Sequence, residues 1–287
     1  MARFQDIKST QNISQISCID FFAGIGAWEL ACELLNQQGG LKFNTQRFIE
    51  IDVNAQKSLQ LNFPNIPIHS DIKTYQPTLF EADVYFVSFP CTGTSSAGKR
   101  TGLEHPESNL WYESLRCIII GRPNFVLIEQ PEGFIHRGLR AVLGGLRMAK
   151  YCWENPQIIS AKELGAPHKR NRIFIIAHSD HLSLQQRQGW KCWSESIGAD
   201  IETARQTFSY PQTQPGGVCL DDELPAWLVG IRADGWWAAN SPPVNSGIEP
   251  RTAGRRECIN LYGRSIVPLQ AAIALMRLKY LVELLIN

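Results

Sequence analysis

Short apolar runs alternate with amphipathic stretches from residue 16 to about residue 179. The runs have the length and the β-branched and aromatic content of buried strands, and the stretches between them carry apolar residues at helical spacing. This alternation is typical of βαβ units and predicts an α/β fold with a doubly wound parallel sheet. The predicted strands are Ile16–Phe22, Arg47–Ile51, Val84–Phe89, Asn124–Glu129 and Arg172–Ala177, and the predicted helices are Trp28–Asn36, Ala55–Asn62, Leu110–Ile120 and Leu139–Tyr151.

The pattern changes at about residue 180, where Gln, Ser, Gly, Pro and Trp become frequent and apolar periodicity weakens. We expect a loop-rich insert there. After Arg264 a helical pattern returns, with an apolar stripe long enough to pack back on the first domain. The sequence therefore predicts a first domain over residues 1–179, a small lobe over residues 180–258, and a C-terminal segment over residues 259–287 that returns to the first domain.

Composition and charge narrow the class of protein. Of the 287 residues, 44% are hydrophobic and 19% are charged, which excludes a disordered, collagen-like or coiled-coil chain. The formal net charge of +1 neither requires nor excludes a polyanionic partner, so any nucleic-acid surface must be local.

Cysteine spacing and apolar content indicate the compartment. Eight cysteines without a Cys-x-x-Cys pair indicate neither a zinc ribbon nor a disulfide framework, and they fit a reducing cytoplasm. The sequence has no secretory signal and no apolar stretch of about 18 residues, so we expect a soluble protein with no membrane partner.

Three strand ends carry features of a nucleotide-binding edge. Gly24 and Gly26 lie where the first predicted strand turns into a helix, which lets a ligand approach the backbone and the helix N-terminus. Glu50 ends the second strand, at the spacing of acidic residues that accept hydrogen bonds from ribose hydroxyls, and Asp71 follows at the same edge. Each feature alone is also typical of an ordinary turn or a solvated strand end. Together they favour an adenosine-containing cofactor.

A cysteine and a glutamate are expected to face one pocket at this edge. Cys91 follows the strand that ends at Phe89, in a polar loop with Lys99 and Arg100 close behind. Nearby cations and free backbone N–H groups lower the pKa of a thiol, which makes Cys91 a candidate nucleophile, although most isolated cysteines are inert core residues. Glu129 ends the next strand, and neighbouring parallel strands would bring its carboxyl group to the same edge as the thiol.

Seven segments resemble the motifs of the bacterial and phage DNA cytosine methyltransferases, which act at carbon 5 of the base. The segments come in the same order as those motifs. They cover residues 16–179 and about 260–280. Any one of them could arise by chance, whereas seven in register point to the family as a whole. The segments are DFFAGIGAWELA, FIEIDVNAQKSLQLNFP, SDI, PCTGTSSAGKRTG, FVLIEQPEGF, GAPHKRNRIFIIA and LYGRSIVP.

The resemblance implies a Rossmann-like sheet that binds S-adenosylmethionine, with a target-recognition lobe inserted before the C-terminal helix. It implies methyl transfer from S-adenosylmethionine to carbon 5 of cytosine in a specific duplex DNA sequence, after the base is flipped out of the stack. Cys91 would add to carbon 6 of the ring as a covalent nucleophile, and Glu129 would hydrogen-bond or protonate ring nitrogen 3. Arg172 and Arg170 would hold the base and the catalytic loop and complement charge on the ring oxygen.

The resemblance also implies the cofactor contacts. At each position an ordinary turn or core residue is the alternative. The implied contacts are Phe22 stacked on the adenine, Glu50 bound to the ribose, Asp71 and Ile72 against the adenine, and the turn of Gly24 and Gly26 beside the methionine portion.

Five residues, in four of the segments, depart from the commonest residues of the family. Thr92 replaces the Gln after the cysteine, and Gln130 and Pro131 replace the Asn-Val after the glutamate. His168 replaces a Gln in the arginine segment, and Arg264 replaces an Asn in the last segment. These changes affect polar groups that brace loops, so they concern geometry rather than the reacting groups. We expect an active enzyme, and a catalytically impaired DNA-binding relative is the alternative.

The predicted lobe has two groups of residues suited to DNA. A basic group just before the last segment fits phosphate contacts, and a solvated helix face is an equal alternative. Four tryptophans are expected to form a mini-core, with stacking on an extruded or orphaned base as the sharper alternative. The basic residues are Arg251, Arg255, Arg256 and Arg264, and the tryptophans are Trp190, Trp193, Trp236 and Trp237.

The expected partner is double-stranded DNA, bound by a monomer at the bacterial nucleoid, and a cognate restriction endonuclease is a candidate partner. An RNA cytosine methyltransferase is a second hypothesis, because one eukaryotic branch of similar enzymes modifies transfer RNA; its Cys-Phe-Thr stretch is absent from this sequence. A dinucleotide oxidoreductase is disfavoured, because the first turn lacks the third glycine of G-x-G-x-x-G. No metal site is predicted, since His178 and His181 lack a third ligand in a supporting pattern.

Overall fold

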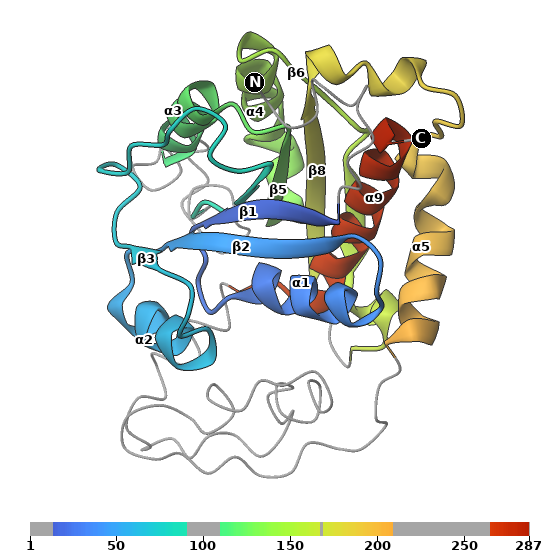
Figure 1. Ribbon diagram of the computed structural model, residues 1–287. Helices are drawn as coiled ribbons and strands as arrows, with labels where there is room; N and C mark the ends of the chain where they lie inside the picture. Colours follow the sequence, from blue (N-terminus) through green and yellow to red (C-terminus); the bar gives the residue numbers. More distant parts are fainter. Residues whose placement is uncertain (1–13, 91–109, 167–168, 209–264, 287) are drawn as a thin grey trace, which may run out of the picture.

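The protein is built on one eight-stranded sheet (Figure 1). The computed structural model describes residues 14–90, 110–166, 169–208 and 265–286. The strands are β1 (Gln15–Phe21), β2 (Lys42–Ile49), β3 (Ile68–His69), β4 (Val84–Val87), β5 (Phe125–Pro131), β6 (Tyr151–Trp153), β7 (Gln157–Ser160) and β8 (Asn171–Ser179). Their order in the sheet is β3-β2-β1-β4-β5-β8-β6, and β7 also pairs with β8.

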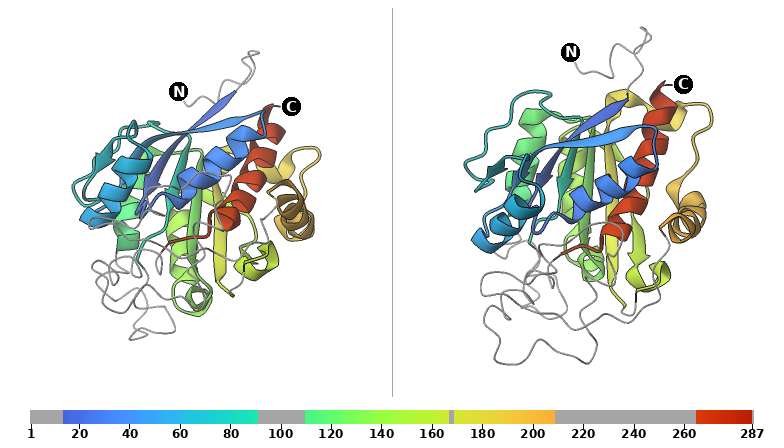
Figure 2. Two further views of the ribbon diagram at one scale, coloured as in Figure 1. Left: turned by 90° about the horizontal axis from the view of Figure 1, so that it is seen from below. Right: turned by 60° about the horizontal axis from the view of Figure 1, so that its bottom comes forward.

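Helices cover both faces of the sheet (Figure 2). On one face, α1 (Ala27–Gln37) packs beside α9 (Pro268–Ile286), and α5 (Trp193–Thr207) packs against α9. On the other face lie α3 (Leu110–Gly121) and α4 (Leu139–Met148). The remaining helix that positions the site, α2 (Val53–Asn62), packs next to β2 through Leu59.

The central strands are apolar on both faces because both faces are covered. On β4, Val84 and Phe86 pack toward α1 and α9, whereas Tyr85 and Val87 pack toward α3 and α4. A strand buried on two sides gains from apolar residues at every position, which explains the continuous apolar run. The α/β class predicted from the sequence is thereby confirmed.

All the predicted strands and helices occur, with shifted ends. The largest changes are at β2, which begins at Lys42 rather than Arg47, and at α4, which ends at Met148 rather than Tyr151. The helix stops there because Lys150 adopts a left-handed conformation with φ of 67° and Tyr151 already belongs to β6.

The prediction of a wholly parallel sheet is wrong at one edge. Strands β1 to β5 pair in parallel, but β8 runs antiparallel to β5, and β6 and β7 run antiparallel to β8. Parallel neighbours need a long crossover, usually a helix. The described part of the connection between β7 and β8 holds the short 3-10 helix Ala161–Leu164 and no longer helix, and the chain returns beside β7 in the opposite direction.

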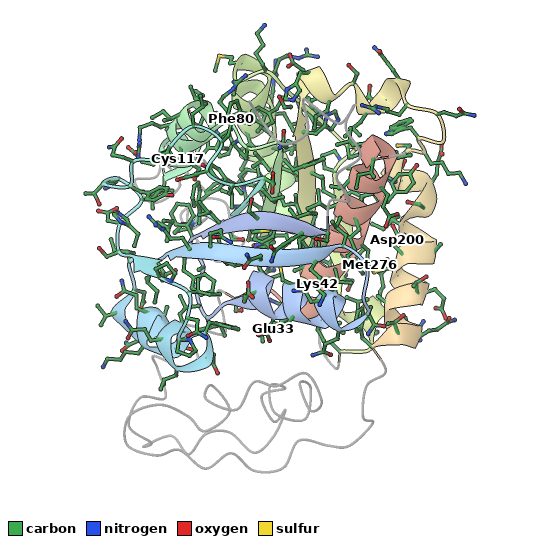
Figure 3. All side chains as sticks on the ribbon, in the orientation of Figure 1. Glu33, Lys42, Phe80, Cys117, Asp200 and Met276 are labelled. Atoms are coloured by element: carbon green, nitrogen blue, oxygen red, sulfur yellow. The ribbon has the colours of Figure 1, made fainter. Side chains whose placement is uncertain are left out.

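The described part of the expected loop-rich insert begins with short 3-10 turns and a loop and then contains a helix. Helix α5 starts at Trp193, whose side chain is 0% exposed and belongs to the core formed with α1 and α9. Trp193 and Ala204 are buried and Ile197 and Ile201 pack partly against the same core, so the helix has a narrow apolar stripe between polar residues. Figure 3 labels Asp200 of α5 and Met276 of α9 on these neighbouring helices.

Two of the four tryptophans assigned to a mini-core therefore pack on the main core. Trp193 is buried within it, and Trp190 packs partly against it. Neither forms a separate core or an open stacking surface. Trp236 and Trp237 lie outside the described residues, as does most of the predicted lobe, so the division into domains stays a prediction.

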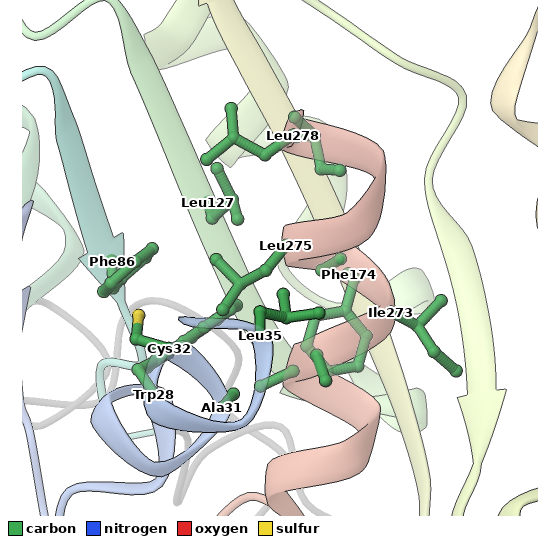
Figure 4. Packing of buried hydrophobic residues seen from close by; sticks show 14 of the residues in the cluster. Trp28, Ala31, Cys32, Leu35, Phe86, Leu127, Phe174, Ile273, Leu275 and Leu278 are labelled. Atoms are coloured by element: carbon green, nitrogen blue, oxygen red, sulfur yellow. The ribbon is translucent and has the colours of Figure 1, made fainter. Parts of the chain in front are cut away.

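The C-terminal helix is a central packing element (Figure 4). Leu275 and Leu278 of α9 meet Leu35 of α1 and Leu127 of β5 in one cluster. Ala271 and Ala274 are fully buried on the same helix, and small side chains permit close approach to neighbouring elements. No helix in the described part of the chain is long and apolar enough to span a membrane.

A buried ion pair ties α9 to the strand edge. The Arg277 guanidinium lies 2.7 Å from a carboxylate oxygen of Glu154, and the two side chains are only 2% and 0% exposed. The same carboxylate accepts hydrogen bonds from the Trp193 backbone N–H and from the Trp190 indole, each at 3.2 Å. Arg277 also donates to the carbonyl oxygen of Lys191. This network joins α9 to the start of α5.

Replacing Arg277 by Met is expected to lower the free energy of unfolding by about 3 kcal/mol, because Glu154 is left buried without its cation. The measurement is urea unfolding at neutral pH. The matched control is Arg205→Met, which removes an exposed pair with Glu202 at 3.4 Å and is expected to lose less than about 0.5 kcal/mol. Similar losses in both variants would contradict this role of the pair.

Candidate active site

The predicted site residues gather where the parallel strands end. β1, β2, β4 and β5 run in the same direction, so their carboxyl ends lie at one edge of the sheet. Phe22 follows β1 and Glu50 follows β2, while Glu129 lies in β5 next to the end of β4. Open α/β sheets bind ligands at such an edge.

The turn after β1 depends on glycine at two positions for different reasons. Gly24 and Gly26 both have positive φ, 56° and 87°. A Cβ atom on Gly26 would overlap the Phe63 ring, whereas one on Gly24 would meet nothing within 4 Å. Gly26 is thus needed for packing of α1 against the end of α2, and Gly24 leaves open space beside the backbone.

Glu50 joins this turn to the end of β2. Its two carboxylate oxygens accept hydrogen bonds from the backbone N–H groups of Gly24 and Asp52, each at 2.7 Å. Burial raises the pKa of Glu50 although these bonds favour the ionised form. The Ile51 backbone N–H is a third donor to this carboxylate, which leaves it capacity to accept about one more hydrogen bond.

Asp71 and Ile72 have ordinary structural contacts. A carboxylate oxygen of Asp71 accepts from the Lys73 backbone N–H at 2.9 Å and closes a turn. The Ile72 side chain is buried in the core with Phe21, and its carbonyl oxygen accepts from Arg116 at 2.8 Å. In this structure Ile72 could offer a ligand its backbone but not its side chain.

Asp20, which the sequence analysis did not single out, is the most unusual acid at this edge. It is 0% exposed, and neither carboxyl oxygen has a hydrogen-bond partner among the residues that the structure describes. Burial, together with the charges of Glu29 and Glu50, raises its pKa well above the ordinary value. The sequence offers one signal for this residue, which is an acid near the end of an otherwise apolar strand. Its environment fits either a protonated carboxyl or a cationic ligand.

Glu29 on α1 adds a second buried acid close to Asp20. Burial raises the pKa of Glu29 to about 7, and the nearby charge of Glu33 adds to the effect. The acids of this edge therefore hold protons at higher pH than exposed carboxyl groups do.

The candidate acid Glu129 is paired with a candidate arginine. Arg172 Nε lies 2.7 Å from Glu129 Oε1, and the two side chains are 13% and 7% exposed. Burial raises the pKa of Glu129 even though the charges of Arg172 and Arg170 oppose the shift. Burial, with the neighbouring charge of Arg172, lowers the pKa of Arg170 to about 10.

The antiparallel direction of β8 brings this pair together. Pro131 at the end of β5 lies opposite Arg172 at the start of β8. In a parallel arrangement, the start of β8 would lie at the opposite edge from Glu129. The correction to the predicted sheet is thus what places the predicted arginine beside the predicted acid.

Arg170 connects this pair with the C-terminal segment. Its guanidinium donates to the Ser265 carbonyl oxygen at 2.5 Å. The Gln270 amide donates to the carbonyl oxygens of Arg170 and Ile159, each at 2.7 Å. The start of α9 therefore fixes the backbone and side chain of Arg170.

Cys91 lies outside the described residues, as do Thr92, His168 and Arg264. Described residues reach as far as Pro90, directly before the cysteine in the sequence. The departure at Gln130 is described: its amide donates to the Phe89 carbonyl oxygen at 3.0 Å.

Comparison with known proteins places this arrangement in a family. A sequence model of the family described as C-5 cytosine-specific DNA methylase matches residues 16–219, which is more than half of the chain. The chain belongs to this C-5 cytosine-specific DNA methylase family. The match spans β1 to α5 and so includes the described candidate residues of both halves of the site.

Relatives in this methylase family align over part of their length. Type II methyltransferase M.HpaII of Haemophilus parainfluenzae is 33% identical over 180 residues, covering 59% of this chain and 48% of that protein. Type II methyltransferase M2.BsuMI of Bacillus subtilis is 31% identical over 247 residues, covering 80% of this chain and 56% of that protein. The chain spans about half the length of the curated relatives that it matches.

Solved structures share the fold. The methyltransferase EhMeth of Entamoeba histolytica superposes with a TM-score of 0.55 and 14% identity, covering 94% of this chain and 98% of that chain. The Dnmt2 methyltransferase of S. pombe gives a TM-score of 0.50 and 19% identity, covering 67% and 55%. Together with the sheet described above, they confirm the predicted Rossmann-like α/β fold.

Replacing Asp20 by Asn is expected to stabilise the ligand-free protein at neutral pH by about 1 kcal/mol or more. The folded-state pKa of Asp20 is raised, so stability falls as pH rises from about 4, where the unfolded chain loses its proton first. Asn does not ionise, and the gain should vanish below about pH 4. Urea unfolding across this pH range measures it.

The control is Asp83→Asn, directly before β4, the strand that neighbours β1. Asp83 is also buried, but its carboxylate accepts from the Ser17 backbone N–H at 2.9 Å and from the Ser17 hydroxyl at 2.6 Å. This variant should lose about 1 kcal/mol at neutral pH. A loss of stability in Asp20→Asn as well would show that Asp20 is not the strained acid described above.

Proposed function

We propose that this protein is a DNA cytosine methyltransferase that transfers a methyl group from S-adenosylmethionine to carbon 5 of cytosine in a specific duplex DNA sequence. The observation that carries the proposal is the buried pair of Glu129 and Arg172, next to the strand end that leads through Pro90 to Cys91. Membership of the methylase family supports the same reaction.

In the proposed reaction Cys91 places negative charge on the cytosine ring and Glu129 stabilises that charge. The Cys91 thiolate adds to carbon 6 of the ring and places negative charge on it, and Glu129 donates a proton or hydrogen bond to ring nitrogen 3. A buried Glu129 suits this role, because its raised pKa keeps more of it protonated near neutral pH than an exposed glutamate. Arg172 would complement charge on the ring oxygen.

Methyl transfer and release of the base complete the proposed cycle. After the thiolate has added, carbon 5 takes the methyl group that bound S-adenosylmethionine supplies. Solvent water then takes the proton from carbon 5, the shared proton returns from ring nitrogen 3 to Glu129, and the thiolate leaves carbon 6, which restores the aromatic ring and the free cysteine. In duplex DNA the base must first leave the stack, because carbon 6 is not reachable within it.

The residues at the β1 and β2 ends fit such a cofactor. The Asp20 carboxyl, which has no hydrogen-bond partner among the described residues, would offset the positive charge of the methionine portion, and Gly24 leaves open space for it. The remaining acceptor site of Glu50 would accept a hydrogen bond from a ribose hydroxyl. Phe22 and the 66% exposed Ile51 provide apolar surface for the adenine. Asp71 and the backbone of Ile72 would contact its edge.

We also propose double-stranded DNA as the partner of a monomeric enzyme, with the lobe over residues 180–258 as its recognition region. The basic group Arg251, Arg255, Arg256 and Arg264 would contact phosphates. The relatives named Type II methyltransferases support a role beside a cognate restriction endonuclease.

Expression in a methylation-deficient bacterial host should protect cytosines in one short sequence motif, as measured by bisulfite sequencing. Cys91→Ala should abolish protection because the nucleophile is lost. Glu129→Gln should lower the methyl-transfer rate of the purified protein by about 100-fold or more, since the acid is lost. Absence of protection by a folded protein that binds S-adenosylmethionine would favour the RNA methyltransferase or the impaired relative.

Calorimetry with S-adenosylmethionine tests the cofactor site separately. Glu50→Gln should weaken binding about tenfold or more, because the amide N–H₂ cannot accept from Gly24, Asp52 or a ribose hydroxyl. Cys91→Ala is the control and should bind as the unaltered protein does. Equal affinity in Glu50→Gln would remove Glu50 from the site, and binding of NAD in its place would support the oxidoreductase alternative.

A further inference from the structure

Ser88 connects the cofactor side of the site with the proposed acid. It directly follows β4, and its hydroxyl oxygen accepts a hydrogen bond from the Trp28 indole at 3.1 Å. Ser88 follows Val87 and Glu129 follows Ile128, and these two preceding residues are paired, so the Ser88 side chain lies beside Glu129 and contacts its carboxyl group. One hydroxyl therefore lies between a residue of α1 and the carboxyl group of β5.

Trp28 fixes the direction of the Ser88 proton. The indole is 1% exposed and stacks on Phe86, with 4.7 Å between ring centres and 6° between ring planes (Figure 4). An indole N–H can only donate, so Ser88 must be the acceptor in that contact. The single hydroxyl proton of Ser88 is then available for the Glu129 carboxylate.

Glu129 is thus held from both neighbouring strands. Arg172 of β8 contacts it on one side of β5 at 2.7 Å, and Ser88 at the end of β4 contacts it from the other. Arg172 and Arg170 are the charged groups that act most strongly on its carboxylate. The arginines supply charge, whereas Ser88 supplies a neutral, directional donor.

These contacts replace the sheet ladder where it ends. The last paired residues of β4 and β5 are Val87 and Ile128, and Pro90, three positions after Val87, has no N–H with which to continue the ladder. Beyond the pair of Val87 and Ile128, two side-chain contacts join the strands: Ser88 contacts Glu129, and the Gln130 amide donates to the Phe89 carbonyl oxygen. Gln130 makes this contact although Asn is the usual residue of the family at this position.

We propose that Ser88, oriented by Trp28, is a positioning residue for the Glu129 carboxyl group, and that Gln130 holds the adjoining Phe89–Pro90 backbone. The proposal rests on the proposed function, in which Glu129 acts on the base and Cys91 follows Pro90. It assigns the two side chains different tasks. Ser88 sets the position and protonation of the acid, and Gln130 sets the strand end that precedes the nucleophile.

The test compares Ser88→Ala with Ser88→Thr, which keeps the hydroxyl. The first measurement is the carboxyl titration of Glu129 by ¹³C NMR, with the resonance assigned by its loss in Glu129→Gln. The hydroxyl favours the ionised carboxylate, so Ser88→Ala should move this titration to higher pH and Ser88→Thr should restore it. This measurement needs neither cofactor nor DNA. Ser88→Gly is a second variant without the hydroxyl and should shift in the same direction.

The second measurement is the single-turnover rate of methyl transfer as a function of pH. Ser88→Ala should be about tenfold slower, with the limb of the pH profile that reports Glu129 moved to higher pH and unchanged affinity for S-adenosylmethionine. Gln130→Leu should also be slower but should leave the Glu129 titration and the shape of the pH profile unchanged. This difference separates the two tasks.

An unchanged Glu129 titration in Ser88→Ala and Ser88→Gly would overturn the role of Ser88. A shifted titration in Gln130→Leu would overturn the separate task of Gln130. If the unaltered protein transfers no methyl group while Ser88→Ala still shifts the Glu129 titration, the proposed function fails and the contact between Ser88 and the acid stands.

Discussion

The contact between Glu129 and Arg172 depends on one feature of the sheet, the antiparallel return of β8 along β5. The parallel strands deliver Glu129 and the end of β4 to one edge. Only a strand entering from that same edge can add an arginine from its first residues. The short connection from Ser160 to Asn171 forces this direction, because a crossover to a parallel strand needs about a dozen residues or more, usually a helix. The described half of the candidate catalytic site is therefore a consequence of chain direction.

Several buried acids lie at the same edge, and burial makes their ionised forms energetically unfavourable. Asp20, Glu29, Glu50 and Glu129 all have raised pKa values, and burial is the leading cause for each. Glu50 and Glu129 are compensated by backbone donors or by arginines, whereas Asp20 has no partner among the described residues. Strained groups of this kind occur where a ligand relieves the strain, and stability is commonly lower at such sites. The proposed cofactor would offset this cost through its positive charge.

Distant parts of the chain support the edge from behind. Helix α9 packs on α1 beneath the glycine turn, and its first residues fix Arg170 through Ser265 and Gln270. Further along α9, Arg277 binds Glu154 and the start of α5. The C-terminal helix thus connects the cofactor half, the arginines and the beginning of the predicted lobe. A substitution in α9 would therefore affect the packing of all three regions, because α9 contacts each of them.

The sequence by itself determined the α/β class, the family and the edge at which Gly24, Glu50 and Glu129 meet. Those features follow from local periodicity and from residues at strand ends, which short segments encode. The tertiary structure alone decided the direction of β8, the isolation of Asp20, the burial of Trp193 in the main core and the contacts of Ser88 and Gln130. Each of these joins residues far apart in the chain or depends on which side chain lacks a partner. Local pattern carries no record of such contacts, because they arise only when separate elements pack together.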